Sequence, residues 1–296
     1  MSYIVGEIMD RFSVAKKVGI IGIIGNAFLF IIKIIVALIS RSQSMLADSI
    51  NSAGDIFASF MTWIGNKISS VPNDEDHNFG HGKAEYLFSM FISISMMLIA
   101  IKLLYDSVLS IVLSNKLTFS WALIVVCLIT VIIKFALFIY TKKIYEETEN
   151  LLVKANMEDH RNDCVITFFT TVAVVLTKYN IYWVDGVVGI GISIWIFIAG
   201  LQLFRDSYNV LMDSSIDNKS KDVILSLIKS YSEIKRVGTL YSIPIGCKYV
   251  VVVTVYVNGK MATTKSHRVA DKLEKRIITE IDKVEKVIVH VEPFIK

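Results

Sequence analysis

The chain has 296 residues, of which 54% are hydrophobic and 20% are charged, and its formal net charge is +4. Its apolar residues come in runs too long for a soluble domain of this size, so the composition indicates an integral membrane protein. The modest charge, without a basic stripe interleaved with aromatic residues, argues against nucleic acid as a partner, and three cysteines without paired spacing argue against a disulfide framework.

The first seventeen residues are too polar and acidic for a cleavable signal peptide, so we expect the first apolar run to be retained as a membrane span. About twenty apolar residues are needed to cross the hydrocarbon core. Four segments meet this length without help, namely Val18–Ser40, Phe88–Leu113, Trp121–Tyr140 and Ile181–Phe204.

Two further apolar segments, Ile56–Ile68 and Cys164–Thr177, are too short to span alone. Each becomes long enough only if its helix also includes the polar residues before it. The sequence therefore predicts six spans, two of which carry the polar stretches Asp48–Asp55 and Asp159–Asp163 into the membrane. Lysine and arginine gather on one side of this arrangement, which predicts that both termini are cytoplasmic.

After residue 213 the sequence becomes mixed and charged, which predicts a small cytoplasmic α+β domain over 214–296, following a transmembrane domain over 1–213. Val-rich Tyr249–Val257 is typical of a buried strand, and Asn258-Gly259 after it indicates a turn. The expected order is helix, strand, strand, helix, strand, near Lys219–Tyr231, Val237–Ile243, Lys248–Val257, Thr264–Ile281 and Val284–Glu292.

The two polar stretches share a spacing of four residues, at Asn51 and Asp55 and again at Asp159 and Asp163, which keeps each pair on one helix face. Charged groups inside a membrane are costly and mark ion or substrate paths. These side chains offer only oxygen ligands, which suit Mn²⁺, Mg²⁺ or Ca²⁺. Their mutual repulsion could be relieved by a divalent cation or by protons. Asp48, on the same stripe, would order the site rather than bind the metal.

Two alternatives to this metal site remain open from the residues alone. The acids could instead form structural ion pairs with the intramembrane lysines Lys33, Lys102 and Lys134. His160 and Cys164 are also four residues apart, on a helix face about 100° away, and would make a softer, zinc-like pair.

The loop Pro72–Glu85, with sequence PNDEDHNFGHGKAE, joins the second and third spans. Asp74, His77 and His81 have spacings that a metal could use on a folded loop; the alternative is a polar connector with glycines for a tight turn. An acidic loop bearing histidine could also gather cations at the mouth of a transport path. In the tail, His267 and His290 are isolated from one another.

At these residues the chain resembles the cation diffusion facilitator family of metal–proton antiporters. The resemblance covers nearly the whole length, through LADSINSAGD, HNFGHGKAE, NMEDHRND, VDGVVGIGIS and the VIVHVEP ending. It implies six helices, a ferredoxin-like cytoplasmic domain and a homodimer. It also implies a transport site at Asn51, Asp55, Asp159 and Asp163. Zinc transporters of the family place histidine at one or both leading positions, so Asn51 and Asp159 resemble the manganese-exporting branch.

The resemblance also implies roles outside the membrane. Asp74, His77 and His81 match loop positions that bind metal in some members, and Lys83 and Asp213 match a charge pair at the dimer's membrane–cytoplasm junction. The family's two-zinc site in the tail is incomplete here. His267, His290 and Glu292 match, but Gly238 and Thr254 stand where two histidines would be, so we expect the tail mainly to dimerise.

These observations predict a proton-coupled exporter of divalent metal, Mn²⁺ first, in a bacterial plasma membrane, working by alternating access without a tightly bound cofactor. Zn²⁺, Fe²⁺ or Cd²⁺ is the alternative cargo. A membrane metalloenzyme would need a further nucleophile or base, and no HExxH or GxSxG motif is present. A metal-sensing or assembly protein would show no net metal flux.

Overall fold

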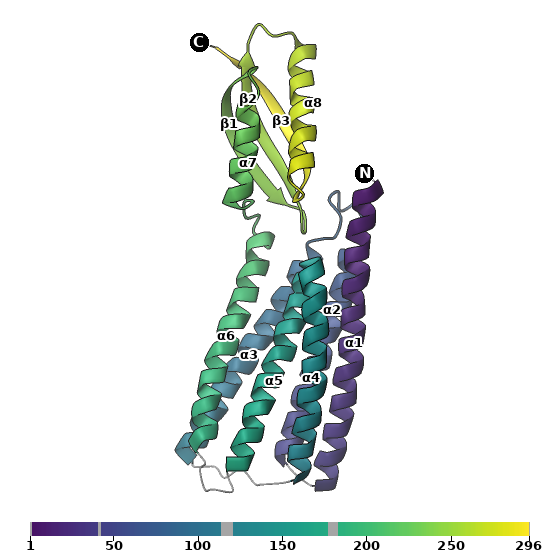
Figure 1. The fold of residues 1–296 in the computed structure, drawn as a ribbon, viewed down its shortest axis with the longest axis vertical. Helices are drawn as coiled ribbons and strands as arrows, with labels where there is room; N and C mark the ends of the chain where they lie inside the picture. Colours follow the sequence, from purple (N-terminus) through teal and green to yellow (C-terminus); the bar gives the residue numbers. More distant parts are fainter. Residues whose placement is uncertain (1, 41–42, 114–120, 177–182, 296) are drawn as a thin grey trace. The chain divides into compact units, whose positions relative to one another are not determined.

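A computed structural model describes residues 2–40, 43–113, 121–176 and 183–295 of the chain (Figure 1). They divide into two compact units, one formed by Met1–Val71 with Ala84–Tyr208 and the other by Pro72–Lys83 with Asn209–Lys296. The loop after the second helix therefore groups with the C-terminal part of the chain.

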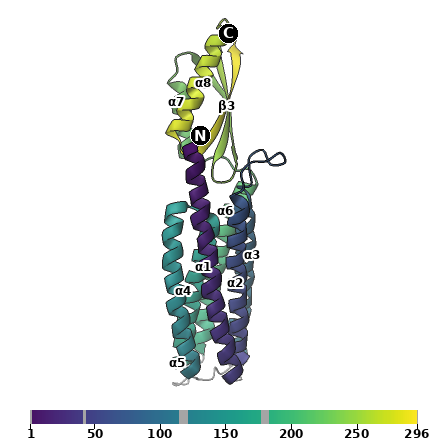
Figure 2. The same cartoon turned by 90° about the vertical axis from the view of Figure 1, so that its right-hand side faces the viewer.

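Six long helices dominate the described part of the chain, and they run side by side (Figures 1 and 2). They are α1 (Ser2–Ser40), α2 (Gln43–Ser69), α3 (Ala84–Leu113), α4 (Trp121–Thr148), α5 (Leu151–Leu176) and α6 (Trp183–Leu211). Among the described residues, four of them are long and apolar enough to cross a membrane, namely α1, α3, α4 and α6. These helices correspond to the four segments predicted to span unaided, apart from residues 181 and 182, which lie outside the described part of the chain.

The prediction that the two short apolar segments continue the polar residues before them is confirmed, because α2 and α5 are each one uninterrupted helix. The polar side of α2 extends further than the sequence analysis recognised. Its buried polar residues recur every three or four positions, which places them on one face of the helix: Ser49, Ser52, Asp55, Ser59, Thr62, Asn66 and Ser69.

Glycines allow α2 to approach its neighbours closely. A Cβ atom added at Gly22 of α1 would lie 2.7 Å from Ser59 Oγ, and one added at Gly65 would lie 2.7 Å from a methyl carbon of Leu152 on α5. Small residues at helix contacts let backbones come together, which favours helix association in a membrane. The polar face of α2 is thereby enclosed by α1 and α5.

The second unit contains α7 (Asn218–Lys229), β1 (Ile234–Pro244), β2 (Tyr249–Asn258), α8 (Thr263–Glu280) and β3 (Val284–Phe294), in the predicted order. The strands form a sheet in the order β1-β2-β3, antiparallel between β1 and β2 and parallel between β2 and β3. A parallel pair needs a crossover connection, which α8 supplies.

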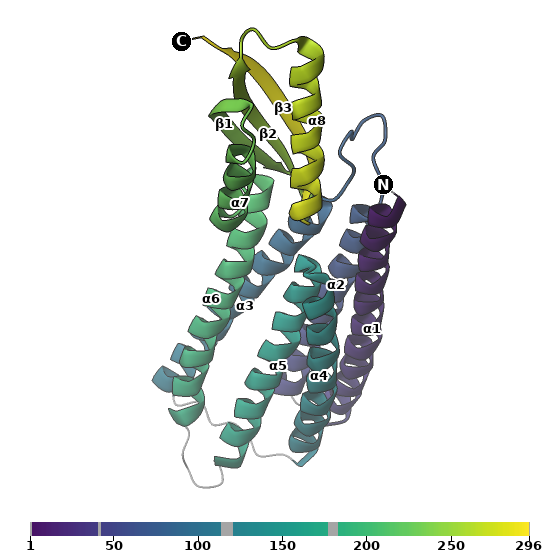
Figure 3. The same ribbon diagram turned by 45° about the horizontal axis from the view of Figure 1, so that its top comes forward.

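Both helices of this unit contribute to one apolar core against the sheet (Figure 3). Ile228 of α7, Leu273 of α8 and Val253 of β2 are fully buried in it. The opposite face carries an apolar row, because Tyr241 of β1 and Ile288 of β3 both pair with Val252 of β2. Tyr241 and Ile288 are 62% and 46% exposed.

Candidate metal centre

Three helices meet at a buried ion-pair cluster in the helical unit. Lys134 of α4 extends its ammonium group to Asp55 of α2, with 2.9 Å between Nζ and Oδ2, and also donates to Oδ2 of Asp163 on α5. The side chains of Lys134, Asp55 and Asp163 are only 1%, 6% and 14% exposed. Asp55 and Asp163, distant in sequence, therefore face the same point.

Asp159 and His160 extend this cluster along α5. One ligand atom from each of Asp159, His160 and Asp163 lies within 4.8 Å of the others, a spacing at which they could hold one metal ion. Among the described residues, Oδ2 of Asp159 and both ring nitrogens of His160 have no hydrogen-bond partner, although His160 is fully buried. Buried polar atoms without partners are uncommon and point to a ligand or ion.

Two residues of the predicted centre have side chains outside what the structure describes. Asp48 and Asn51 lie within the bounds of α2, but their side chains are outside what the structure describes, so their roles stay predictions. From the residues alone, His160 and Cys164 were an alternative, softer pair on a helix face apart from the acids. Instead, His160 gathers with Asp159 and Asp163, whereas the Cys164 thiol lies 3.8 Å from the carbonyl oxygen of Val131.

The intramembrane lysines differ in what they contact. Lys134 makes the structural ion pairs that the sequence analysis left open as an alternative. Lys33 donates to Ser52 Oγ at 3.0 Å, and Lys102 is exposed on α3. Asp55 and Asp163 are thus held by Lys134, which was named from the sequence only as part of a rival explanation.

A ladder of buried hydrogen bonds joins the centre to one end of the bundle. Asn26 of α1 donates to the carbonyl oxygen of Asp55 at 3.1 Å and to Ser59 Oγ at 3.0 Å. Further bonds continue along α2 and α5: Ser59 to Asn156, Asn156 to Thr62, Asn66 to the carbonyl oxygen of Thr62, and Asn150 to Asn66. These residues were not predicted, although the three- and four-residue spacing of the members on α2 indicates a shared polar face.

At the end of this ladder, a buried fork ties three parts of the bundle together. Arg11 of α1 donates to both carboxylate oxygens of Glu85 on α3, at 2.8 and 3.0 Å, and to the carbonyl oxygen of Thr148 at 2.6 Å. Glu85 is fully buried and also accepts the backbone N–H of Leu151 at 2.6 Å. Glu85 thus neutralises Arg11 and satisfies an otherwise unpaired N–H at the start of α5.

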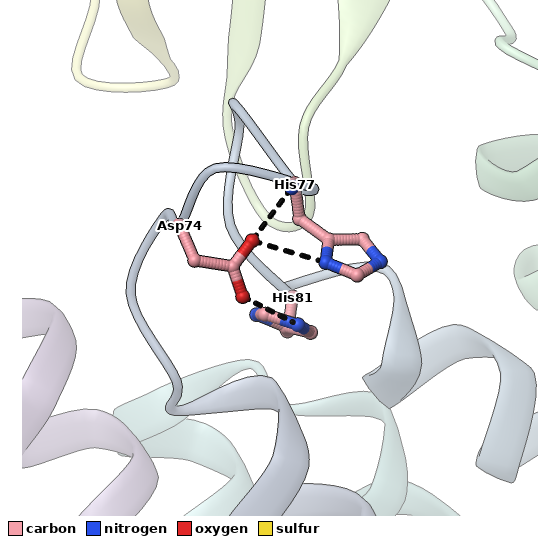
Figure 4. Close-up of side chains that lie close together, drawn as sticks. All are labelled: Asp74, His77 and His81. Carbon is pink, nitrogen blue, oxygen red and sulfur yellow. Dashed lines mark hydrogen bonds and ion pairs between the residues drawn. The ribbon is translucent and has the colours of Figure 1, made fainter.

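The loop residues Asp74, His77 and His81 are brought together as the spacing suggested (Figure 4). Oδ1 of Asp74 accepts the backbone N–H of His77 at 2.6 Å, and its Oδ2 lies 3.6 Å from Nε2 of His81. The hydrogen bond from the His77 backbone holds the pKa of Asp74 below its ordinary value, so this carboxylate is ionised at neutral pH. One carboxylate and two imidazoles converge on a solvent-exposed position.

Other contacts fix this loop within its unit. Lys83 Nζ lies 2.6 Å from Oδ1 of Asp213, so the predicted charge pair forms within one chain. Gly82 lies against Gly246, where an added Cβ would stand 3.2 Å from the Gly246 Cα. Gly246 itself has a φ of +96°, a conformation that glycine adopts readily.

The tail residues do not gather. His290 and Glu292 on β3 lie 2.7 Å apart, but His267 on α8 pairs with Asp271 instead, at 3.6 Å. Among the described residues, these three form no cluster of the kind seen at the other two places. Gly238 is also closely packed, because an added Cβ would lie 3.0 Å from the Cβ of Thr254.

Comparison with known proteins covers both units. Residues 19–212 match the family described as cation efflux transmembrane domain, and residues 216–294 match the cation efflux protein cytoplasmic domain. The manganese efflux system protein MneP of Bacillus subtilis is 26% identical over 293 residues, covering 96% of this chain and 98% of that protein. The magnetosome protein MamM of Magnetospirillum gryphiswaldense is 26% identical, covering 94% of this chain and 88% of its own length.

Among solved structures, the metal-bound C-terminal domain of the CzcD transporter from Thermotoga maritima matches 26% of this chain and 94% of that domain. Its identity is 23% and its TM-score is 0.25.

Proposed function

This chain belongs to the cation efflux family of metal ion transporters, and we propose that it exports Mn²⁺ across the bacterial plasma membrane in exchange for protons. In this proposal six helices span the membrane, with both termini and the loop after α2 in the cytoplasm. The transmembrane domain covers residues 1–213 and a ferredoxin-like cytoplasmic domain covers 214–296. Manganese is the cargo named for the relative MneP, which aligns over nearly its full length.

The observation that carries the proposal is the convergence of carboxylates from α2 and α5, two long helices that are more polar than the other four. Asp55 lies on α2, and Asp159 and Asp163 lie on α5, all buried or nearly so. Acids in a lipid-spanning helix are costly and are retained where an ion passes. Carboxylate oxygens are the ligands that Mn²⁺ favours, and we propose that Asn51 adds an amide oxygen.

The same set of acids supports exchange with protons. Carboxylates gathered in a medium of low dielectric constant repel one another strongly unless a cation or protons neutralise them. Metal leaving outward would therefore be replaced by protons, and alternating access would prevent a continuous leak. We propose that the ladder from Asn66 to Asp55 marks the cytoplasmic side of this path, because its amide and hydroxyl oxygens can replace part of a cation's hydration shell.

The direct test is transport by the purified protein in sealed lipid vesicles. With Mn²⁺ outside and an acidic interior, we expect accumulation of Mn²⁺ together with alkalinisation of the lumen, read by a metal-sensitive and a pH-sensitive dye. Collapsing the proton gradient should reduce the flux by at least about tenfold. Flux without proton movement would refute the exchange, and the absence of metal flux would favour a sensing or assembly role instead.

One observation favours Zn²⁺ as a second cargo. The imidazole of His160 lies in the cluster with Asp159 and Asp163, and nitrogen ligands strengthen zinc binding more than manganese binding. We expect His160→Asn to weaken Zn²⁺ binding relative to Mn²⁺ by about tenfold, in competition binding to the purified protein. Cys164→Ser, one turn further along α5 and outside the cluster, is the matched control. An unchanged metal preference would remove His160 from the ligand set.

The second unit supports two accessory roles in the proposal. Asp74, His77 and His81 offer a mixed oxygen and nitrogen site on the cytoplasmic loop, which could collect metal near the path. The exposed apolar row Tyr241, Val252 and Ile288 offers a surface for a second copy of the chain. We propose a homodimer formed through the cytoplasmic domain, with Lys83 and Asp213 at its junction with the membrane domain.

A further inference from the structure

Lys134 contacts two acids of the candidate centre but has no role in the transport cycle as proposed so far. Its Nζ lies 2.9 Å from Oδ2 of Asp55 and is hydrogen-bonded to Oδ2 of Asp163. A divalent cation held by these oxygens would stand about 2.0–2.6 Å from each of them. It would then occupy nearly the same place as the ammonium group, and both could not remain there.

We propose that Lys134 is a tethered cation that competes with the transported metal for the carboxylates of Asp55 and Asp163. The inference rests on the proposed function of this site. Lys134 offsets one of the two negative charges when no metal holds the acids, which leaves the other charge for a proton, and a metal must displace its ammonium to bind. Affinity is thereby lowered to a level from which the metal can leave again.

The surroundings of Lys134 offer the displaced ammonium another hydrogen-bond partner. Lysine carries its charge on a flexible stem with three rotatable donors. One turn earlier on α4, the hydroxyl of Thr130 is buried and, among the described residues, has no hydrogen-bond partner. A partner that is unused in one position of the lysine is thus available in another.

This competition also accounts for selectivity by charge. A monovalent cation such as Na⁺ or K⁺ would gain from the two carboxylates no more than the ammonium already supplies, whereas a divalent ion has twice the charge. Lys134 therefore favours divalent cargo over the abundant monovalent ions of the cytoplasm. A lysine that only joined helices would have no such effect on binding.

The test is equilibrium Mn²⁺ binding at fixed pH to the purified full chain carrying His77→Ala and His81→Ala, which disable the loop cluster. Signal that persists after Asp163→Asn is subtracted as binding elsewhere. In this background, Lys134→Met should lower Kd by at least tenfold, equivalent to about 1.4 kcal/mol, and should allow 150 mM K⁺ to compete. Lys102→Met, which removes an exposed lysine of α3, should leave Kd unchanged.

Lys134→Arg covers the case in which Lys134→Met does not fold. Arginine retains the charge and holds carboxylates through a rigid two-pronged fork, so it should raise Kd by at least tenfold. An unchanged or raised Kd in Lys134→Met, or an unchanged or lowered Kd in Lys134→Arg, would overturn the competition. Wild-type vesicles that transport no metal would overturn the proposed function instead, whatever these Kd values are.

Discussion

Replacing Asp163 by asparagine is expected to reduce proton-driven Mn²⁺ transport by at least about 100-fold, because even groups that only orient metal ligands change affinity by 10–100-fold. The variant removes a charged ligand while keeping the shape of the side chain. It should also fold, since Lys134 keeps its ion pair with Asp55 at 2.9 Å. Initial rates in the vesicle assay, normalised to the amount of inserted protein, measure the effect.

Asp55→Asn should reduce transport to the same extent, because it also removes a charged ligand. It should fold as well, since Lys134 then keeps its ion pair with Asp163. Asp106→Asn is the matched control: it makes the same chemical change on α3, where the side chain is exposed. Transport within twofold of the wild type in both Asp55→Asn and Asp163→Asn would eliminate the proposed centre. A loss in Asp106→Asn as well would show that the assay reports general damage.

The second large effect is expected at the Arg11–Glu85 fork. Glu85→Ala removes a buried carboxylate and leaves both the guanidinium of Arg11 and the N–H of Leu151 without this acceptor. Breaking a buried ion pair from one side costs about 3–5 kcal/mol, and we expect about 3 kcal/mol because the Arg11 side chain is 13% exposed. Unfolding by added SDS, followed through tryptophan fluorescence, measures this change in free energy.

The matched control for the fork is Glu146→Ala on α4. Glu146 forms an exposed pair with Lys142 at 3.8 Å, so its loss should cost no more than about 0.5 kcal/mol. Glu85→Gln should fall between the two, since the amide oxygen still accepts the N–H of Leu151. A loss below about 1 kcal/mol in Glu85→Ala would contradict the view that this fork holds α1, α3 and the start of α5 together.

Segment lengths and residue periodicity were sufficient to predict most of the secondary structure. The polar stretches before Ile56 and Cys164 belong to α2 and α5, as predicted. The prediction rested on length, because an apolar run too short to cross a membrane needs further helical residues to reach the required length. The tail elements follow the expected order because alternation and turn residues act locally. Element ends were less predictable: α4 continues to Thr148 and α1 begins at Ser2, since charged residues are good helix formers beyond the apolar run.

The family resemblance and the spacing predicted one centre from Asn51, Asp55, Asp159 and Asp163, and a loop cluster from Asp74, His77 and His81. In the structure the described acids of the centre lie close to one another, as do the three loop residues. The side chains of Asp48 and Asn51 lie outside what the structure describes, so the predicted part of Asn51 in choosing the metal stays a prediction. The tail site was expected to be incomplete because Gly238 and Thr254 stand where two histidines would be, and that expectation stays a prediction.

The sequence by itself predicted which helices carry buried charge, because burying a carboxylate is so costly that its presence in a helix expected to span a membrane is informative on its own. It did not determine the partners of those charges. Three lysines were equally available by sequence, and only the packing of α2, α4 and α5 selected Lys134 for Asp55 and Asp163. The same packing also places His160 beside Asp159 and Asp163. Contacts between helices depend on their relative rotation and depth, and these are properties of the assembled bundle that no local pattern encodes.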